Sequence, residues 1–183
     1  MERKDFFKNI CKYGACGCAG MMMLSPAKLL ANDDSQEEKK EDWRIGFIQN
    51  RMAKFIEDME GKVDEGTIAS LLENMGKNCA SEHSDGYIKF KGDVKGYVDS
   101  LKNWVESADY DEEKGVIKII GVKNNSCFCP FVDVDKMPKE FCNCTKGWSK
   151  EAYGTITGKQ VDVKIDETVL WGGERCSFTL TLK

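Results

Sequence analysis

The last stretch of the chain, residues 160–183, reads QVDVKIDETVLWGGERCSFTLTLK. Apolar and polar residues alternate over 161–165 and again over 176–182, which is the period of strands buried on one face. The pair Gly172-Gly173 between them marks a turn. The stretch therefore predicts a C-terminal β-hairpin in a small antiparallel sheet.

Upstream of this hairpin the periodicity is mostly helical. Apolar residues recur at three- and four-residue steps in three segments, and a fourth segment is also interpreted as a helix: 42–59, 64–79, 92–107 and 145–156. In this interpretation Cys79 lies on a core stripe, and Trp104 and Trp148 fill the core. The segment 115–122 predicts a strand, and 127–134 a short strand or extended loop. Helices followed by an antiparallel sheet define the α+β class, with N-terminal helices packed on the sheet.

Composition narrows the classes of function. The 183 residues are 41% hydrophobic and 32% charged, with a formal net charge of −4. That length suits one domain with a short appendage. The absence of a basic surplus argues against a nucleic-acid partner, and no apolar run reaches the roughly 18 residues of a membrane-spanning helix.

The N-terminus has the pattern of an export signal. The motif RKDFFK at residues 3–8 resembles the twin-arginine motif, with lysine replacing the second arginine. A mildly apolar stretch follows and ends in small residues. We therefore expect a signal peptide over 1–31, a polar spacer over 32–41 and a single cysteine-rich domain over 42–183. The protein would be periplasmic or otherwise extracytoplasmic and would meet the membrane only during export. The alternative is an amphipathic first helix on a cytoplasmic protein.

The chain has nine cysteines, and three of them precede the predicted domain. Within the domain, Cys127, Cys129, Cys142 and Cys144 form the pattern Cys-x-Cys, twelve residues that begin with Pro130, Cys-x-Cys. Four thiolates can bind zinc or an iron–sulfur cluster, although Cys-x-x-Cys is the more usual spacing for both. These four residues are the predicted metal ligands.

Two other chemistries fit the same cysteines. One thiolate, activated by Lys139, Lys146 or a helix start, can act as a nucleophile, and Cys129 and Cys142 are the candidates. Alternatively, the six cysteines of the domain form disulfides in an oxidising compartment. His83 is the only histidine and could pair with a catalytic cysteine, but it lies in a polar stretch expected to be a loop.

Three motifs carry a resemblance to a known family. They are CxCPF at 127–131, FCxCxxGW at 141–148 and TxxxGGxxCxF at 168–178. The chain resembles export-tagged bacterial proteins related to the L-2-amino-thiazoline-4-carboxylic acid hydrolase family, and more distantly 4-vinyl-reductase-type ligand-binding domains. The resemblance implies an α+β domain with a small-molecule ligand and a pocket lined by cysteines, with Cys79 and Cys176 as neighbours. For the named hydrolases it implies ring opening of a cyclic precursor of cysteine.

The sequence thus supports three hypotheses. The first is an exported domain that binds a metal, an iron–sulfur cluster or a small ligand through the cysteines. The second is a hydrolase acting on a small thiazoline-type substrate. The third is a disulfide-stabilised binding module without catalysis.

Overall fold

The computed structural model describes residues 42–183. The predicted signal peptide and spacer lie outside the described residues. The helices of the domain are α2 (Trp43–Met59), α3 (Glu65–Glu82), α4 (Val94–Leu101) and α5 (Cys142–Thr157). Short 3₁₀ turns are η2 (Ser84–Gly86), η3 (Ile88–Phe90), η4 (Lys139–Phe141) and η5 (Val169–Trp171). No helix within 42–183 is long and apolar enough to cross a membrane.

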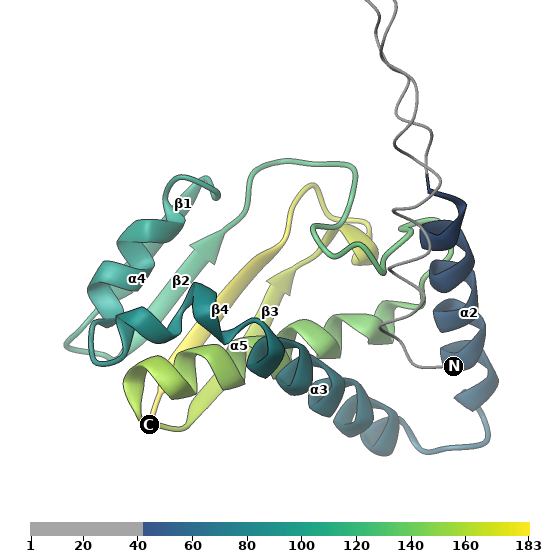
Figure 1. The fold of residues 1–183 in the computed structure, drawn as a ribbon, viewed down its shortest axis with the longest axis horizontal. Helices are drawn as coiled ribbons and strands as arrows, with labels where there is room; N and C mark the ends of the chain where they lie inside the picture. The colour runs from purple at the N-terminus through teal and green to yellow at the C-terminus, as the bar shows by residue number, and fades with distance from the viewer. Residues whose placement is uncertain (1–41) are drawn as a thin grey trace, which may run out of the picture. The chain divides into compact units, whose positions relative to one another are not determined.

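Four antiparallel strands form one sheet in the order β1-β2-β4-β3. Their bounds are β1 (Ser107–Asp111), β2 (Val116–Ile120), β3 (Val161–Glu167) and β4 (Ser177–Leu182). The register pairs Val163 with Leu180, and Leu180 in turn with Ile117, so that these three side chains share the inner face of the sheet. The α+β class and the C-terminal pair of antiparallel strands are therefore confirmed (Figure 1).

Helices cover this inner face. Tyr97 and Val98 of α4 and Tyr153 and Ile156 of α5 are buried in one core cluster with the inner strand residues. The side chains on the other face are mainly polar and include Lys118, Lys164 and Thr179 at one level of the sheet. Burial on one face only explains why the alternation in the sequence is so regular.

Helices α3 and α5 lie side by side, as Figure 1 shows, and glycines permit their close approach. A Cβ added at Gly76 would lie 1.9 Å from the carbonyl oxygen of Cys144, and one at Gly147 would lie 1.8 Å from that of Glu73. Only a residue without a side chain fits at these two points. The crossing therefore brings the start of α5 against the second half of α3.

A second core cluster lies where α2, α3 and the loop before α5 meet. Its buried members are Ala53, Ile56, Ile68, Leu72, Val132, Met137 and Phe141. The side-chain amide of Gln49 on α2 donates a hydrogen bond of 2.9 Å to the carbonyl of Pro130 and joins the helix to the loop. The loop that carries Cys127 and Cys129 is thus packed against the helices.

The structure differs from the predicted elements in three places. The third helix ends at Leu101, Trp104 beyond it is 75% exposed, and Ser107–Asp111 is an additional strand, β1. Strand β1 has only Ala108 and Tyr110 on its inner face, a weak apolar pattern that becomes a strand through its pairing with β2. Of the two forms predicted for residues 127–134, the strand is not formed and the segment is a loop, with turns around Pro130.

The third difference concerns the cysteines. Helix α5 begins at Cys142, so that Cys142 and Cys144 lie in its first turn rather than before it. Cys79 is exposed and not on the buried stripe of α3, which consists of Ile68, Leu72, Gly76 and Ala80. The helical period is correct there, but the buried stripe is narrower than predicted, because Leu71 and Cys79 are exposed.

Candidate functional site

Six cysteines of the described residues converge from four parts of the domain. Cys79 belongs to the last turn of α3, Cys127 and Cys129 to the loop after β2, Cys142 and Cys144 to the first turn of α5, and Cys176 directly precedes β4. All six are free thiols. Three of them, Cys127, Cys129 and Cys144, pack against the second core cluster. Elements far apart in sequence therefore form one thiol-rich centre.

The thiols are close enough to act on one another electrostatically. Burial raises the pKa of Cys144 to about 12, and the charges of Cys129, Cys79, Cys127 and Cys142 act in the same direction. Cys79 and Cys176, expected to be neighbours of the four predicted ligands, thus lie in the same cluster.

The cluster contains two groups of three thiols that also interact with each other, since the charges of Cys127 and Cys142 act on Cys144 and that of Cys129 acts on Cys127. Burial raises the pKa of Cys129 and the charge of Cys79 adds to it, so Cys79, Cys129 and Cys144 all interact with one another. We call these three the outer trio, because Cys79 is exposed.

Cys127, Cys142 and Cys176 form the inner trio. Burial raises the pKa of Cys142 to about 11, and the charges of Cys176 and Cys127 raise it too. Burial also raises the pKa of Cys176, with a contribution from Cys127. The thiol of Cys142 donates a 3.4 Å hydrogen bond to the hydroxyl of Thr168, which is 2% exposed.

Backbone N–H groups point at three of the sulfurs. Burial raises the pKa of Cys127, while the N–H groups of Cys129 and Phe128 oppose that shift by donating to its sulfur. In the same way, burial raises the pKa of Cys129, and a hydrogen bond from the N–H of Phe131 lowers it in part. Burial also raises the pKa of Cys176, and its sulfur accepts a hydrogen bond from the N–H of Val169 that lowers the pKa in part. Such donors stabilise a thiolate more than a thiol.

The direction of these pKa shifts is opposite to the one expected for an activated nucleophile. Burial raises the pKa of Cys129 and Cys142, and neither Lys139 nor Lys146 contributes to the shift of either thiol. Both thiols are therefore protonated near neutral pH in this arrangement.

The sulfurs interact but do not form a ready coordination shell. Among residues 42–183, no group of three or more histidine, cysteine, aspartate or glutamate residues is placed so that it could hold a metal ion. His83, the exposed C-cap of α3, hydrogen-bonds through Nδ1 to the carbonyl oxygen of Cys79 at 2.9 Å. The roles predicted for the six cysteines stay predictions.

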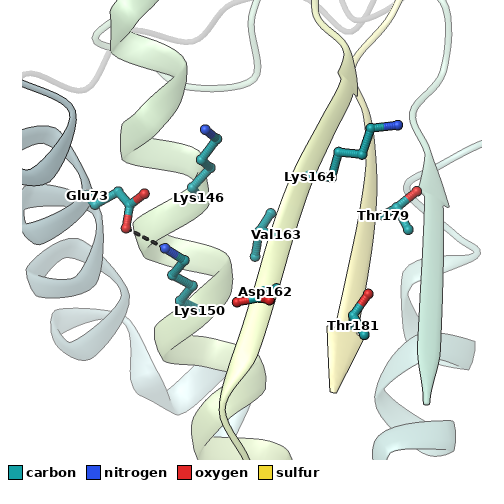
Figure 2. Close-up of a pocket in the computed structure, with 8 residues that line it drawn as sticks. All are labelled: Glu73, Lys146, Lys150, Asp162, Val163, Lys164, Thr179 and Thr181. Atoms are coloured by element: carbon teal, nitrogen blue, oxygen red, sulfur yellow. Dashed lines mark hydrogen bonds and ion pairs between the residues drawn. The ribbon is translucent and has the colours of Figure 1, made fainter. Parts of the chain in front are cut away.

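A polar cavity of about 350 Å³ lies apart from the thiols, along α5 and β3 (Figure 2). It is lined by Glu73, Lys146, Lys150, Asp162, Val163, Lys164, Thr179 and Thr181. Lys150 forms an ion pair of 2.6 Å with Glu73, and both side chains are less than one-third exposed. Sequence reasoning missed this cavity. The only signal was two lysines four residues apart on one helix face.

Fold and site together define an α+β domain with a cysteine cluster between its helices and its loops. Residues 25–183 match a family described as a family of unknown function (DUF6144), and the chain belongs to that family. None of the curated proteins is significantly similar to the chain. The resemblance to thiazoline hydrolases stays a prediction.

The solved structures that are similar to the chain include two with 16% sequence identity. One is subunit 3 of a trafficking protein particle complex from Naegleria fowleri, covalently bound to palmitic acid, with 16% identity and a TM-score of 0.51. The match covers 77% of this chain and 96% of that one, and it shows a shared fold. The other is a mutant H-NOX domain from Shewanella oneidensis in the Fe(II)CO state, with 16% identity and a TM-score of 0.38 over 84% of this chain and 83% of that one.

Proposed function

We propose that this domain binds a thiophilic metal ion or an iron–sulfur cluster through its cysteines. The observation that carries the proposal is the convergence of six thiols from four separate elements. Ligand sets made only of sulfur select zinc, Cu(I) and iron–sulfur clusters over the hard cations that prefer oxygen. Packing alone does not require six cysteines in one place, since any small apolar residue would serve.

The hydrogen bonds to the sulfurs support this choice. Burial raises the pKa of Cys127, Cys129 and Cys176, yet backbone N–H groups already donate to all three sulfurs. Such donors are of little use to a neutral thiol or a disulfide but stabilise the negative charge of a metal-bound thiolate. The bound cation supplies the positive charge that compensates burial.

Binding requires two changes at the site. The sulfurs turn toward one another, because they are not yet arranged around a common point. Each ligand also releases its proton, so the affinity increases with pH. Because burial raises the pKa of Cys142 and Cys144, this dependence extends to higher pH for these two ligands, each of which still carries a proton that the metal must displace.

Metal analysis of the full chain, purified without oxygen, tests the proposal. We expect bound zinc or iron, or a coloured cluster, that is lost when Cys129 and Cys144 are replaced by serine. A triple serine variant of Cys11, Cys16 and Cys18 is the matched control and keeps the metal. Protein without metal, and with six unreactive thiols in the domain, would refute the proposal. Thiazoline turnover that depends on Cys129 or Cys142 would favour the hydrolase instead, and disulfide bonds between the cysteines would favour the disulfide-stabilised binding module.

A second candidate is a covalent acyl thioester on one of the thiols. The structure with the shared fold that binds palmitic acid covalently favours this candidate. Intact-mass spectrometry of the purified chain separates it from the metal, because an acyl group persists after denaturation and is released by hydroxylamine. An unmodified mass would contradict it.

We also propose that residues 1–31 direct export, as the RKDFFK motif suggests. Twin-arginine export carries folded proteins, which suits a domain that acquires its metal before leaving the cytoplasm. Replacement of Arg3 and Lys4 by glutamine should retain the protein in the cytoplasmic fraction of the cell. Equal distribution of variant and parent would refute this part.

A further inference from the structure

We infer that the cavity between α5 and the β3–β4 strands binds a small anionic molecule through a carboxylate or phosphate group. This inference is independent of the cysteine cluster. Its basis is the charge balance of the lining residues and the volume of the cavity. Figure 2 shows the lysines of α5 between Glu73 on α3 and the strand β3.

The acidic groups of the cavity are already neutralised. Glu73 is paired with Lys150 at 2.6 Å, and Asp162 is paired with Lys183. A bound anion therefore meets no unpaired carboxylate on this wall, and Lys150 is held by Glu73 in a fixed position beside it.

Lys146 supplies the unbalanced positive charge. It is half-buried, and no ion pair or hydrogen bond among residues 42–183 involves its ammonium group. Lys164, by contrast, is paired with Asp166 at 2.8 Å. A cation partly withdrawn from water without a counter-ion attracts an anion more strongly than an exposed one.

The cavity extends around the edge strand β3 to the polar face of the sheet. On that face, turned away from α5, Thr179 and Thr181 of β4 pair in register with Lys164 and Asp162 of β3. The Thr179 hydroxyl donates to Asp166 at 2.5 Å, so the lysines of α5, and not the threonines, provide the contacts to an anion. A volume of about 350 Å³ is near the lower end of the range of small-molecule sites, roughly 300–1,000 Å³, and exceeds what a single phosphate fills.

Titration of the isotope-labelled full chain with inorganic phosphate, and separately with citrate, tests the inference by NMR. We expect saturable amide shifts that centre on Lys146, Lys150 and Val163. Lys146→Ala should weaken binding about tenfold or more, as expected for the loss of one charge-assisted hydrogen bond. Lys146→Arg should retain most of the affinity.

Lys95→Ala is the matched control. Lys95 is an exposed lysine on α4 outside the cavity, so its loss changes the net charge equally and should leave the affinity unchanged. Binding of both phosphate and citrate would show that the cavity recognises oxyanions in general. Binding of one probe alone would show that the ligand is a phosphate or a carboxylate, respectively. Shifts scattered over the surface, absence of binding by either probe, or equal weakening in the two alanine variants would overturn the inference. None of these outcomes depends on metal content.

Discussion

At the scale of single residues, the most informative side chains are the buried thiols of α5. Burial raises the pKa of Cys142 to about 11 and that of Cys144 to about 12, from a reference value of 9.0. A thiol that holds its proton more tightly in the folded chain stabilises the fold below the unfolded pKa. It loses that contribution as the pH rises through the folded pKa.

The metal-free protein should therefore become less stable above pH 9. We expect its free energy of unfolding to fall by about 1 kcal/mol between pH 8 and pH 10, after allowance for partial exposure. Urea unfolding with reductant and chelator measures this. In the Cys142→Ala/Cys144→Ala variant the decrease should be smaller, since the two thiols whose pKa burial raises to about 11 and about 12 are gone, whereas the other cysteines, the tyrosines and the lysines still titrate. An identical pH dependence in variant and parent would contradict the pKa shifts.

At the scale of elements, the α3–α5 crossing decides where the outer trio lies, because Cys144 and Gly76 meet there. Gly76→Ala and Gly147→Ala each force a methyl group into a backbone carbonyl and should lower the free energy of unfolding by about 1–3 kcal/mol or more. Gly46→Ala in α2, with nothing within 4 Å of the added Cβ, should raise it by up to about 1 kcal/mol. Denaturant unfolding compares the three, and a neutral Gly147→Ala would disprove the close approach.

The same elements explain what the sequence could and could not predict. Strands β3 and β4 and helices α2, α3 and α5 were predictable because one face of each is apolar over several turns or pairs. Strand β1 was missed because its identity comes from pairing with β2. That Cys79 and Cys176 lie near the other thiols was suggested only by the resemblance, and the polar cavity was not predicted. Neither feature can be derived from a local pattern, because each depends on how α5 packs against α3 and the sheet.

At the scale of the whole molecule, the cysteines bring together parts of the chain that are far apart in sequence. Cys79 lies in the last turn of α3, Cys176 directly precedes β4, and the loop with Cys127 and Cys129 packs against the second core cluster. Under the proposed function, an ion bound at this centre would hold helix, loop and strand together. Because the unfolded chain cannot arrange the ligands, binding energy becomes folding stability.

Addition of Zn²⁺ to the reduced, metal-free full chain should therefore raise its Tm. At a free concentration 100-fold above the Kd, the stabilisation is about 2.7 kcal/mol, reduced by any binding to unfolded cysteines. For a domain of this size that corresponds to a rise of several degrees. Calorimetry with and without chelator measures this rise in Tm.

The rise should disappear in a Cys127→Ser/Cys129→Ser variant and persist in the triple serine variant of Cys11, Cys16 and Cys18. An equal rise in both variants would place the ion elsewhere, because only the first removes sulfurs that connect the loop to α5 and β4.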